Sequence, residues 1–328
     1  MTDTPSLQPS RERARSSSGS YCMKIIITGG TGLIGRELTQ TLARDGHQLT
    51  SLVREVKSPS NHPATFLKWN VEHGQIEDTP KLDRHDAVIH LAGESVAEGR
   101  WTEERKRRIR DSRVKGTRLL VQTLARLNQP PKIFLSASAI GFYGADRGEE
   151  ILTEESEPGA GFLADVCHQW EAEAVRAKDF GARVVLLRTG IVLSATGGAL
   201  GKMLPVFKMG LGGKLGSGKQ FMSWIALVDE IGAIRFALEN ETVRDAVNLT
   251  APHPVTNTEF TETMGRVLSR PAFLHVPESV LRLALGEMGA TVLGSLCVLP
   301  KRLEAAGYQF QFTELENALR ALNLRGGE

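Results

Sequence analysis

A glycine-rich turn after a short apolar run constrains the fold of this chain more than any other feature. Residues 24–28 are Lys-Ile-Ile-Ile-Thr, a β-branched run typical of a buried strand. Glycines follow at three-residue intervals, and residues 35–45 then have the apolar period of a helix. A strand, a glycine turn and a helix in this order let the backbone approach a pyrophosphate at the helix start. The pattern predicts a dinucleotide site lined by Gly29, Thr31, Gly32, Leu33, Ile34 and Gly35.

Composition limits the kinds of partner. The 328 residues are 41% hydrophobic and 24% charged, which suits one or two globular domains. A net charge of +2 gives no reason to expect nucleic acid or an anionic membrane. Cys22, Cys167 and Cys297 form no Cys-x-x-Cys pair, so neither a disulfide nor a metal site is predicted, and a cytoplasmic location fits. No stretch has the roughly 20 mainly apolar residues of a membrane span.

Residues 1–22 differ from the rest because they are rich in Ser, Arg and Pro. One interpretation is a disordered tail, or translation that starts at Met23 rather than at Met1. The other is a transit peptide, since Arg- and Ser-rich segments poor in acidic residues direct proteins to plastids or mitochondria.

Strand-like and helical segments alternate through the first half of the chain. This pattern predicts an α/β fold with a doubly wound parallel sheet, in which residues 23–188 bind the nucleotide and residues of about 226–250 return to the sheet. Residues 189–328 are expected to form a smaller, loop-rich substrate or cap region, with a helical module at about 270–318. The expected strands are 24–28, 48–53, 87–91, 132–136 and 183–187, and the expected helices are 35–45, 102–127 and 164–178.

The residue at the end of the second strand indicates which nucleotide binds. A carboxylate at this place would accept a hydrogen bond from a ribose 2′-hydroxyl, but the residue here is Arg54. A guanidinium instead binds a 2′-phosphate through two parallel hydrogen bonds, so NADP(H) is the predicted cofactor, with a solvated surface arginine as the alternative. Further residues expected at the cofactor are Asn70, Leu91, Ala92 and Gly93; for Asn70, a role in a turn is an equal alternative.

Several stretches resemble the extended short-chain dehydrogenase/reductase superfamily. They are Thr28–Gly35, Val88–Gly93 and Ser136–Gly144. Within it, the chain is similar to the sugar-nucleotide-epimerase-like branch that is sometimes labelled a cell-division inhibitor and carries a short C-terminal helical module. This closer resemblance rests on residues 162–171, 197–200, 216–225 and 298–303. It implies a Rossmann fold of the extended type and an NAD(P) cofactor.

The resemblance also shows what is missing. The superfamily uses a Ser, a Tyr and a Lys four residues after the Tyr. Ser138 fits the first position, but counting from it places Leu163 and Cys167 where the Tyr and Lys are expected. An Asn that often supports proton transfer is replaced by Arg113. Tyr143, five residues after Ser138, is the remaining catalytic candidate, with packing against its neighbour as the alternative.

Four polar residues are expected to contact a small polar substrate: Arg113, Arg188, Gln220 and Ser223. Two functions remain open. The first is an NADP-dependent oxidoreductase or epimerase-like enzyme without the usual Tyr–Lys pair. The second is a non-catalytic NADP-binding regulatory protein that engages a protein partner, in cell or organelle division. The oligomeric state does not follow from the sequence.

Overall fold

The computed structural model describes residues 22–56 and 63–324. The interpretations of residues 1–22 therefore fall outside the described chain, except at Cys22. Among the described residues, no helix is long and apolar enough to cross a membrane.

One large sheet organises the first half of the molecule. Its eight strands have the order β13-β8-β6-β5-β1-β2-β3-β4, and every neighbouring pair is parallel except β3 with β4. The strands are β1 (Lys24–Thr28), β2 (Gln48–Val53), β3 (Ala64–Asn70), β4 (Gln75–Ile76), β5 (Ala87–His90), β6 (Ile133–Ala139), β8 (Arg183–Thr189) and β13 (Asp245–Leu249). The predicted doubly wound parallel sheet is confirmed.

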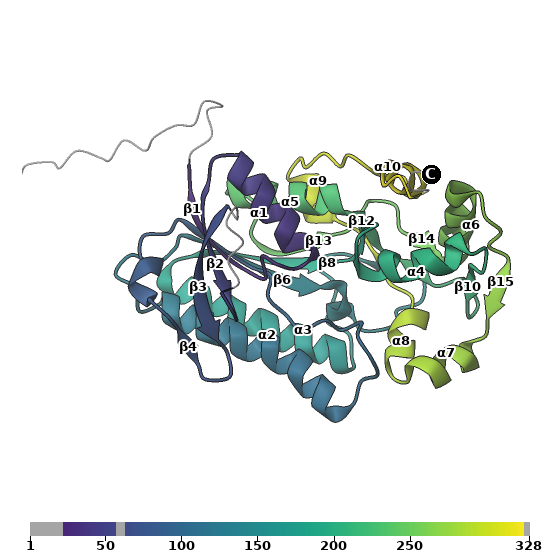
Figure 1. Cartoon of the computed structure of the whole chain (residues 1–328), viewed down its shortest axis with the longest axis horizontal. Helices are drawn as coiled ribbons and strands as arrows, with labels where there is room; N and C mark the ends of the chain where they lie inside the picture. The colour runs from purple at the N-terminus through teal and green to yellow at the C-terminus, as the bar shows by residue number, and fades with distance from the viewer. Residues whose placement is uncertain (1–21, 57–62, 325–328) are drawn as a thin grey trace, which may run out of the picture.

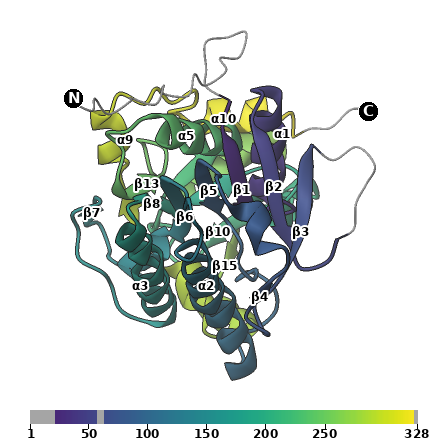
Figure 2. The ribbon, with the colours of Figure 1, turned by 90° about the vertical axis from the view of Figure 1, so that its left-hand side faces the viewer.

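Helices cover both faces of this sheet, as Figure 2 shows. On one face lie α1 (Leu33–Arg44) and α5 (Leu227–Glu239), and on the other α2 (Glu103–Leu124) and α3 (Phe162–Val175). Alternate residues of each strand face opposite cores, because side chains along a strand alternate between its faces. Thus Ile25 and Ile27 pack on the α1–α5 side, whereas Ile26 packs on the α2–α3 side. Burial on both faces explains the unbroken apolar run that was visible in the sequence.

A second region, on the right in Figure 1, has its own core. It is built from α4 (Gly198–Lys208), α6 (Asn257–Leu268) and α10 (Leu315–Ala321) with the strand pair β9 (Ile191–Leu193) and β12 (Trp224–Ala226). The segment expected to be loop-rich therefore contains a helix, α4. The apolar residues Leu200, Leu204 and Phe207 form its buried face, a period that the surrounding glycines obscured in the sequence.

Short elements complete the chain. The remaining strands are β7 (Ile151–Leu152), β10 (Gly213–Leu215), β11 (Phe221–Met222), β14 (Val255–Thr256), β15 (Leu274–Val276) and β16 (Cys297–Val298). The remaining helices are η1 (Thr79–Leu82), η2 (Ile140–Tyr143), η3 (Arg176–Phe180), α7 (Glu278–Leu285), α8 (Met288–Leu293) and α9 (Lys301–Ala305). β16 pairs with β7, so the C-terminal segment is joined to the loop that precedes α3.

Candidate functional site

The glycine turn brings two strand ends into direct contact. Gly29 has φ +72°, and a Cβ atom there would lie 2.7 Å from the carbonyl carbon of Leu91. A Cβ on Gly35 would collide with the carbonyl oxygen of Gly29. Neither position tolerates a side chain, because backbone atoms already fill the space. The turn therefore holds the start of α1 close against the ends of β1 and β5.

The start of α1 is open to a ligand. Gly32 occupies its N-cap position and supplies no side-chain hydrogen bond to the helix. Thr31 and Gly32 are exposed, while Leu33 and Ile34 are half-buried. The first N–H groups of a helix have no partner within it, and the helix dipole favours an anion there. This end of α1 is thus suited to a phosphate group.

A buried chain of hydrogen bonds aligns the same strand ends. His90 Nδ1 lies 2.7 Å from Thr28 Oγ1, and its Nε2 lies 2.9 Å from Thr117 Oγ1 on α2. Thr28 Oγ1 also accepts a hydrogen bond from the N–H of Ala92. Burial lowers the pKa of His90 to about 3, so its ring is neutral at pH 7. These contacts fix the position of Leu91 and Ala92 beside the glycine turn.

Arg54 and Asn70 lie at the ends of neighbouring strands, but they differ in their hydrogen bonds. Arg54 follows β2, is exposed, and has no hydrogen bond or ion pair with the described part of the chain. Its guanidinium is free to meet a ligand. Asn70 ends β3, and its side-chain oxygen accepts hydrogen bonds from the N–H groups of Glu72 and His73. This is the turn role that the sequence left as an alternative for Asn70.

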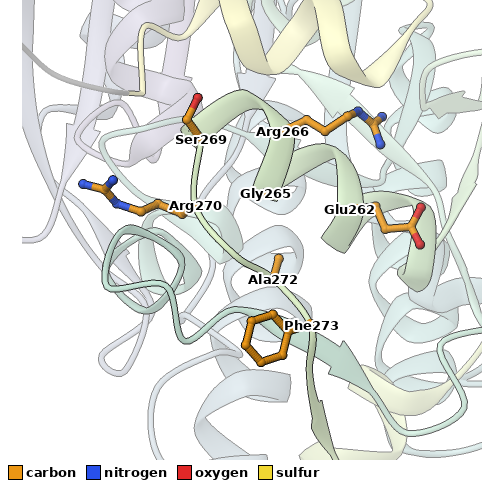
Figure 3. A pocket seen from close by; sticks show the side chains of 7 residues that line it. All are labelled: Glu262, Gly265, Arg266, Ser269, Arg270, Ala272 and Phe273. Atoms are coloured by element: carbon orange, nitrogen blue, oxygen red, sulfur yellow. The ribbon is translucent and has the colours of Figure 1, made fainter.

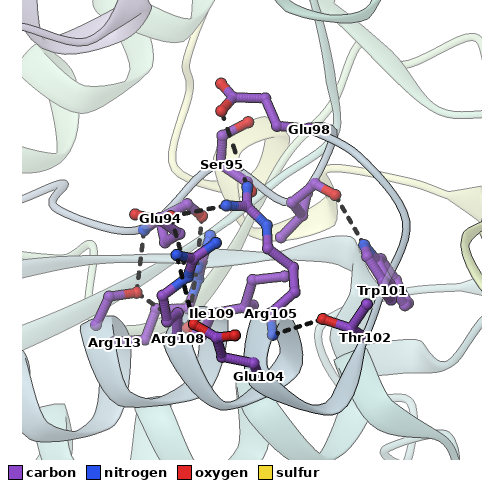
Figure 4. Close-up of polar contacts among 12 residues, drawn as sticks. Glu94, Ser95, Glu98, Trp101, Thr102, Glu104, Arg105, Arg108, Ile109 and Arg113 are labelled. Carbon is purple, nitrogen blue, oxygen red and sulfur yellow. Dashed lines mark hydrogen bonds and ion pairs between the residues drawn. The ribbon is translucent and has the colours of Figure 1, made fainter.

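Two arginines of α2 brace the loop after β5 (Figure 4). Arg105 pairs with the carboxylate of Glu94 at 2.8 Å and donates to the carbonyl of Ser95. Arg113 donates to the carbonyl of Glu94 at 2.9 Å and to that of Ile109 at 3.1 Å. Its Cζ atom lies 5.2 Å from the ring centre of Trp170. Arg113 also lies directly over Gly93, where a Cβ atom would be only 3.0 Å from Cζ.

Three of the predicted residues meet in one buried polar network. Ser138 Oγ donates to Glu171 Oε1 at 2.6 Å. Arg188 binds both carboxylate oxygens of Glu171, each at 2.9 Å, and lies over the ring of Phe142. Because β6 extends to Ala139, Ser138 lies inside the strand rather than after it. Its side chain faces α3, on which Glu171 lies four residues after Cys167.

Tyr143 extends this network toward the C-terminal segment. It is fully buried in η2, donates from its hydroxyl to Asn248 Oδ1 at 2.7 Å, and accepts from Arg188 at 3.1 Å. Burial raises the pKa of its phenol. In this arrangement Tyr143 is a buried hydrogen-bonding residue, and its catalytic role stays a prediction. Asn248, which the sequence analysis missed, is a polar residue between the apolar Val247 and Leu249 of strand β13, and that exception was the available signal.

The residues at the expected Tyr and Lys positions lie beside Ser138, as counting along the chain predicted. Cys167 is buried against Ser138 and Gly141, and Leu163 also packs on Gly141. Burial raises the pKa of the Cys167 thiol to about 11, so it carries no charge at pH 7. Neither side chain supplies the acid or the ammonium group of the usual pair.

Gln220 and Ser223 make hydrogen bonds within the protein. Gln220 donates to the carbonyl of Leu215. Ser223 donates to the carbonyl of Leu296 at 2.7 Å and accepts from the N–H of Val298 at 2.8 Å. Both are buried, and Ser223 anchors the C-terminal segment. Their contact with a substrate stays a prediction.

Two of the cavities on the surface of the described chain lie in very different places. The larger, about 540 Å³, lies on the outside of α6 and contains none of the predicted site residues (Figure 3). The smaller, about 300 Å³, separates the start of α1 from the turn before α4 and is lined by Leu33, Arg36, Glu37, Thr196, Gly197 and Leu227. The described residues contain no group of His, Cys, Asp and Glu side chains that could hold a metal ion.

Comparison with known proteins decides the family. The model of the NAD dependent epimerase/dehydratase family matches residues 25–250, and a domain of unknown function, DUF1731, matches residues 276–322. The chain belongs to the NAD dependent epimerase/dehydratase family. The resemblance to extended short-chain dehydrogenases, including the separate C-terminal module, is confirmed.

Relatives of this epimerase family chain match almost its whole length. An epimerase family protein of Mycobacterium bovis is 40% identical over 305 residues, which are 92% of this chain and 98% of that protein. The chloroplastic SDR39U1 homologue of Arabidopsis thaliana is 39% identical over 306 residues, 92% of this chain and 86% of its own length. The crystal structure of human SDR39U1 (isoform 2) with NADPH has a TM-score of 0.82 and 33% identity, and covers 92% of this chain and 99% of the human chain. Its NADPH agrees with the cofactor predicted from Arg54.

Proposed function

We propose that this chain is an NADP(H)-dependent oxidoreductase or epimerase-like enzyme that acts on a small polar substrate at the carboxyl edge of the large sheet. One observation carries the proposal. The uncapped start of α1 lies against the ends of β1 and β5, and Arg54, which has no ion pair among the described residues, follows the adjacent strand. The NADPH in the human relative supports the same cofactor.

The residues present fit such a cofactor. The backbone at residues 31–34 would bind the pyrophosphate, Leu91, Ala92 and Gly93 would border it, and Arg54 would bind the 2′-phosphate. When bound, NADP(H) supplies or accepts a hydride at its nicotinamide ring. The protein's part is to hold the substrate carbon against that ring. Correct orientation of the two reactants by itself accelerates such a transfer strongly.

One observation favours the second candidate function, a non-catalytic NADP-binding regulatory protein. The hydroxyl protons of Ser138 and Tyr143 are both donated to buried protein acceptors, Glu171 and Asn248. In this arrangement neither hydroxyl donates a proton to a substrate. An assay of sugar nucleotides, aldehydes and ketones with NADPH separates the two functions: turnover that falls in Ser138→Ala supports the enzyme, and no turnover on any of them favours the regulatory protein.

Calorimetric titration with NADPH and NADH tests the cofactor. We expect the wild-type chain to prefer NADPH, and Arg54→Gln to weaken NADPH binding about tenfold or more while NADH binding stays unchanged. A charge-assisted hydrogen bond contributes about 1.5–3 kcal/mol, and each 1.4 kcal/mol is a factor of ten. Arg44→Gln, an exposed arginine at the other end of α1, is the matched control. Equally weak binding of both nucleotides by the wild type would refute the proposal.

A further inference from the structure

Arg113 differs from the arginines nearest to it because no described carboxylate is its partner. Arg188 pairs with Glu171, Arg105 with Glu94, and Arg118 with Glu173. Arg113 forms no ion pair with any described residue, and only its Nη1 donates, to two backbone carbonyls. Arg113 is half-buried, and a cation partly removed from water without a counter-charge is costly, so such groups are normally paired.

Among the described residues, only Cys167 and the carboxylate of Glu94 place negative charge near Arg113. Burial lowers the pKa of its guanidinium, which reflects this unfavourable environment. The neighbouring Cys167 is a neutral thiol at pH 7, because burial raises its pKa to about 11. The carboxylate of Glu94 is already bound by Arg105 at 2.8 Å, with Arg108 at 3.9 Å. A counter-anion would therefore have to come from outside the described chain.

A side chain beside Arg113 has a buried donor that lacks an acceptor. Trp170, whose ring lies against the guanidinium, is 4% exposed. Its indole N–H is buried and has no acceptor among the described residues. The unsatisfied N–H of Trp170 and the donors of Arg113 other than Nη1 fit a ligand that offers oxygen atoms, since buried donors are almost always satisfied.

The position of this pair is where a ligand is expected in such a sheet. Gly93 follows β5, and the guanidinium lies in the space that any side chain at residue 93 would need. Ligands of open α/β sheets bind outside the carboxyl ends of the strands. Leu91 and Ala92, just before Gly93, lie against the glycine turn. Arg113 therefore lies close to the proposed cofactor site but does not line the glycine turn.

We propose that Arg113 is an anion-binding residue that takes a carboxylate or phosphate group of a ligand at the end of β5. This inference rests on the proposed function and narrows its substrate to an anionic one. A guanidinium suits both groups, because its planar fork matches two oxygen atoms. The same chemistry could come from the phosphates of the cofactor, so the experiment must separate the two sources.

The test uses calorimetry on the full chain with three titrants: NADPH, then oxalate and inorganic phosphate added to protein saturated with NADP⁺. If the anion belongs to the substrate, Arg113→Gln keeps its NADPH affinity and loses oxalate or phosphate binding at least tenfold. If it belongs to the cofactor, Arg113→Gln weakens NADPH binding at least tenfold, and neither small anion binds the saturated protein. Failure of wild-type NADPH binding would count against the proposed function and not against this inference.

Two further variants keep the test decisive. Arg118→Gln removes a guanidinium from the same helix whose charge is matched by Glu173, so every affinity should stay as in the wild type. Arg113→Lys retains the positive charge and should keep part of the affinity that Arg113→Gln loses. A residue that only braces the loop would not show this partial recovery. Unchanged binding of all three titrants in a folded Arg113→Gln variant would overturn the inference.

Discussion

Two buried carboxyl groups in this protein differ in their partners. Glu171 accepts hydrogen bonds from the guanidinium of Arg188 at both carboxylate oxygens. Glu230, on α5, is 1% exposed and accepts only one hydrogen bond, from the hydroxyl of Thr189 at 2.8 Å. Its other oxygen has no partner among the described residues. Burial raises the pKa of Glu230 from 4.5 to about 8, so it is largely protonated at pH 7.

The first stability prediction concerns Glu230→Gln. The folded protein keeps the Glu230 proton up to about pH 8, whereas the unfolded chain releases it near pH 4.5. The contribution of protonated Glu230 to the free energy of unfolding is therefore complete below pH 4.5 and is lost as the pH rises to about 8. Glutamine does not titrate, so the variant should gain stability relative to the wild type by up to about 1.4 kcal/mol per pH unit across this range.

Urea unfolding at several pH values measures this effect. Glu239→Gln, at the exposed end of the same helix, is the control and should keep the wild-type pH dependence. A Glu230→Gln variant whose stability runs parallel to the wild type from pH 4.5 to 8 would show that Glu230 is ionised in the fold.

Among the elements, the segment around β16 links regions that are distant in the chain. β16 pairs with β7, and the carbonyl of Leu299 accepts a hydrogen bond from Asn248, which in turn holds Tyr143. Thr250 donates to the carbonyl of Val298. The DUF1731 module therefore supplies part of the frame around Ser138 and Tyr143 rather than standing apart from it.

Ser223→Ala tests this link. The change removes the partner of the Val298 N–H and of the Leu296 carbonyl, and an unsatisfied buried polar group costs about 1–3 kcal/mol. We expect a loss of about 1–3 kcal/mol in the free energy of urea unfolding. Ser217→Ala, at an exposed serine of the preceding turn, should stay within about 0.5 kcal/mol of the wild type. A Ser223→Ala variant as stable as this control would show that the link contributes little.

Local periodicity explains how far the elements could be predicted. The strands at 24–28 and 48–53 have the expected bounds, because apolar β-branched runs bounded by turns mark buried parallel strands. β3 was not predicted, since its residues form neither an unbroken apolar run nor a strict polar–apolar alternation. The glycine turn, and with it the family, could be recognised from the sequence because the motif is made of residues that are neighbours in the chain.

Long-range contacts explain what could not be predicted at the site. The sequence singled out Ser138, Tyr143 and Arg188, and the structure brings them together around Glu171. The sequence could not show that these side chains make their hydrogen bonds within the protein. For example, Asn248, which accepts from Tyr143, lies 105 residues away from it. Ser223 was likewise selected for its polarity, and its actual partners lie 73 and 75 residues away.

At the scale of the whole molecule, the cores are not confined to the segments of the family models. Leu303, in the DUF1731 module, is fully buried in the core formed by the large sheet with α1 and α5. Leu315 and Leu319, in the same module, complete the core around α4 and α6. The module thus contributes to both regions, and its own helix α7 contains no buried residue. A segment that buries its apolar side chains in two other cores has little core to fold by itself.

The molecule should therefore unfold as one cooperative unit, and Leu303→Ala should destabilise all of it. Removing a fully buried leucine typically costs about 2–5 kcal/mol. We expect circular dichroism and tryptophan fluorescence to give coincident transitions in the wild type, because Trp69 and Trp224 report on two different cores. In Leu303→Ala both transitions should move together to lower urea concentration. Leu283→Ala, at a side chain that is 79% exposed in the same module, is the control and should leave them in place. A separate early transition in Leu303→Ala, with the fluorescence transition unmoved, would show that the module unfolds independently.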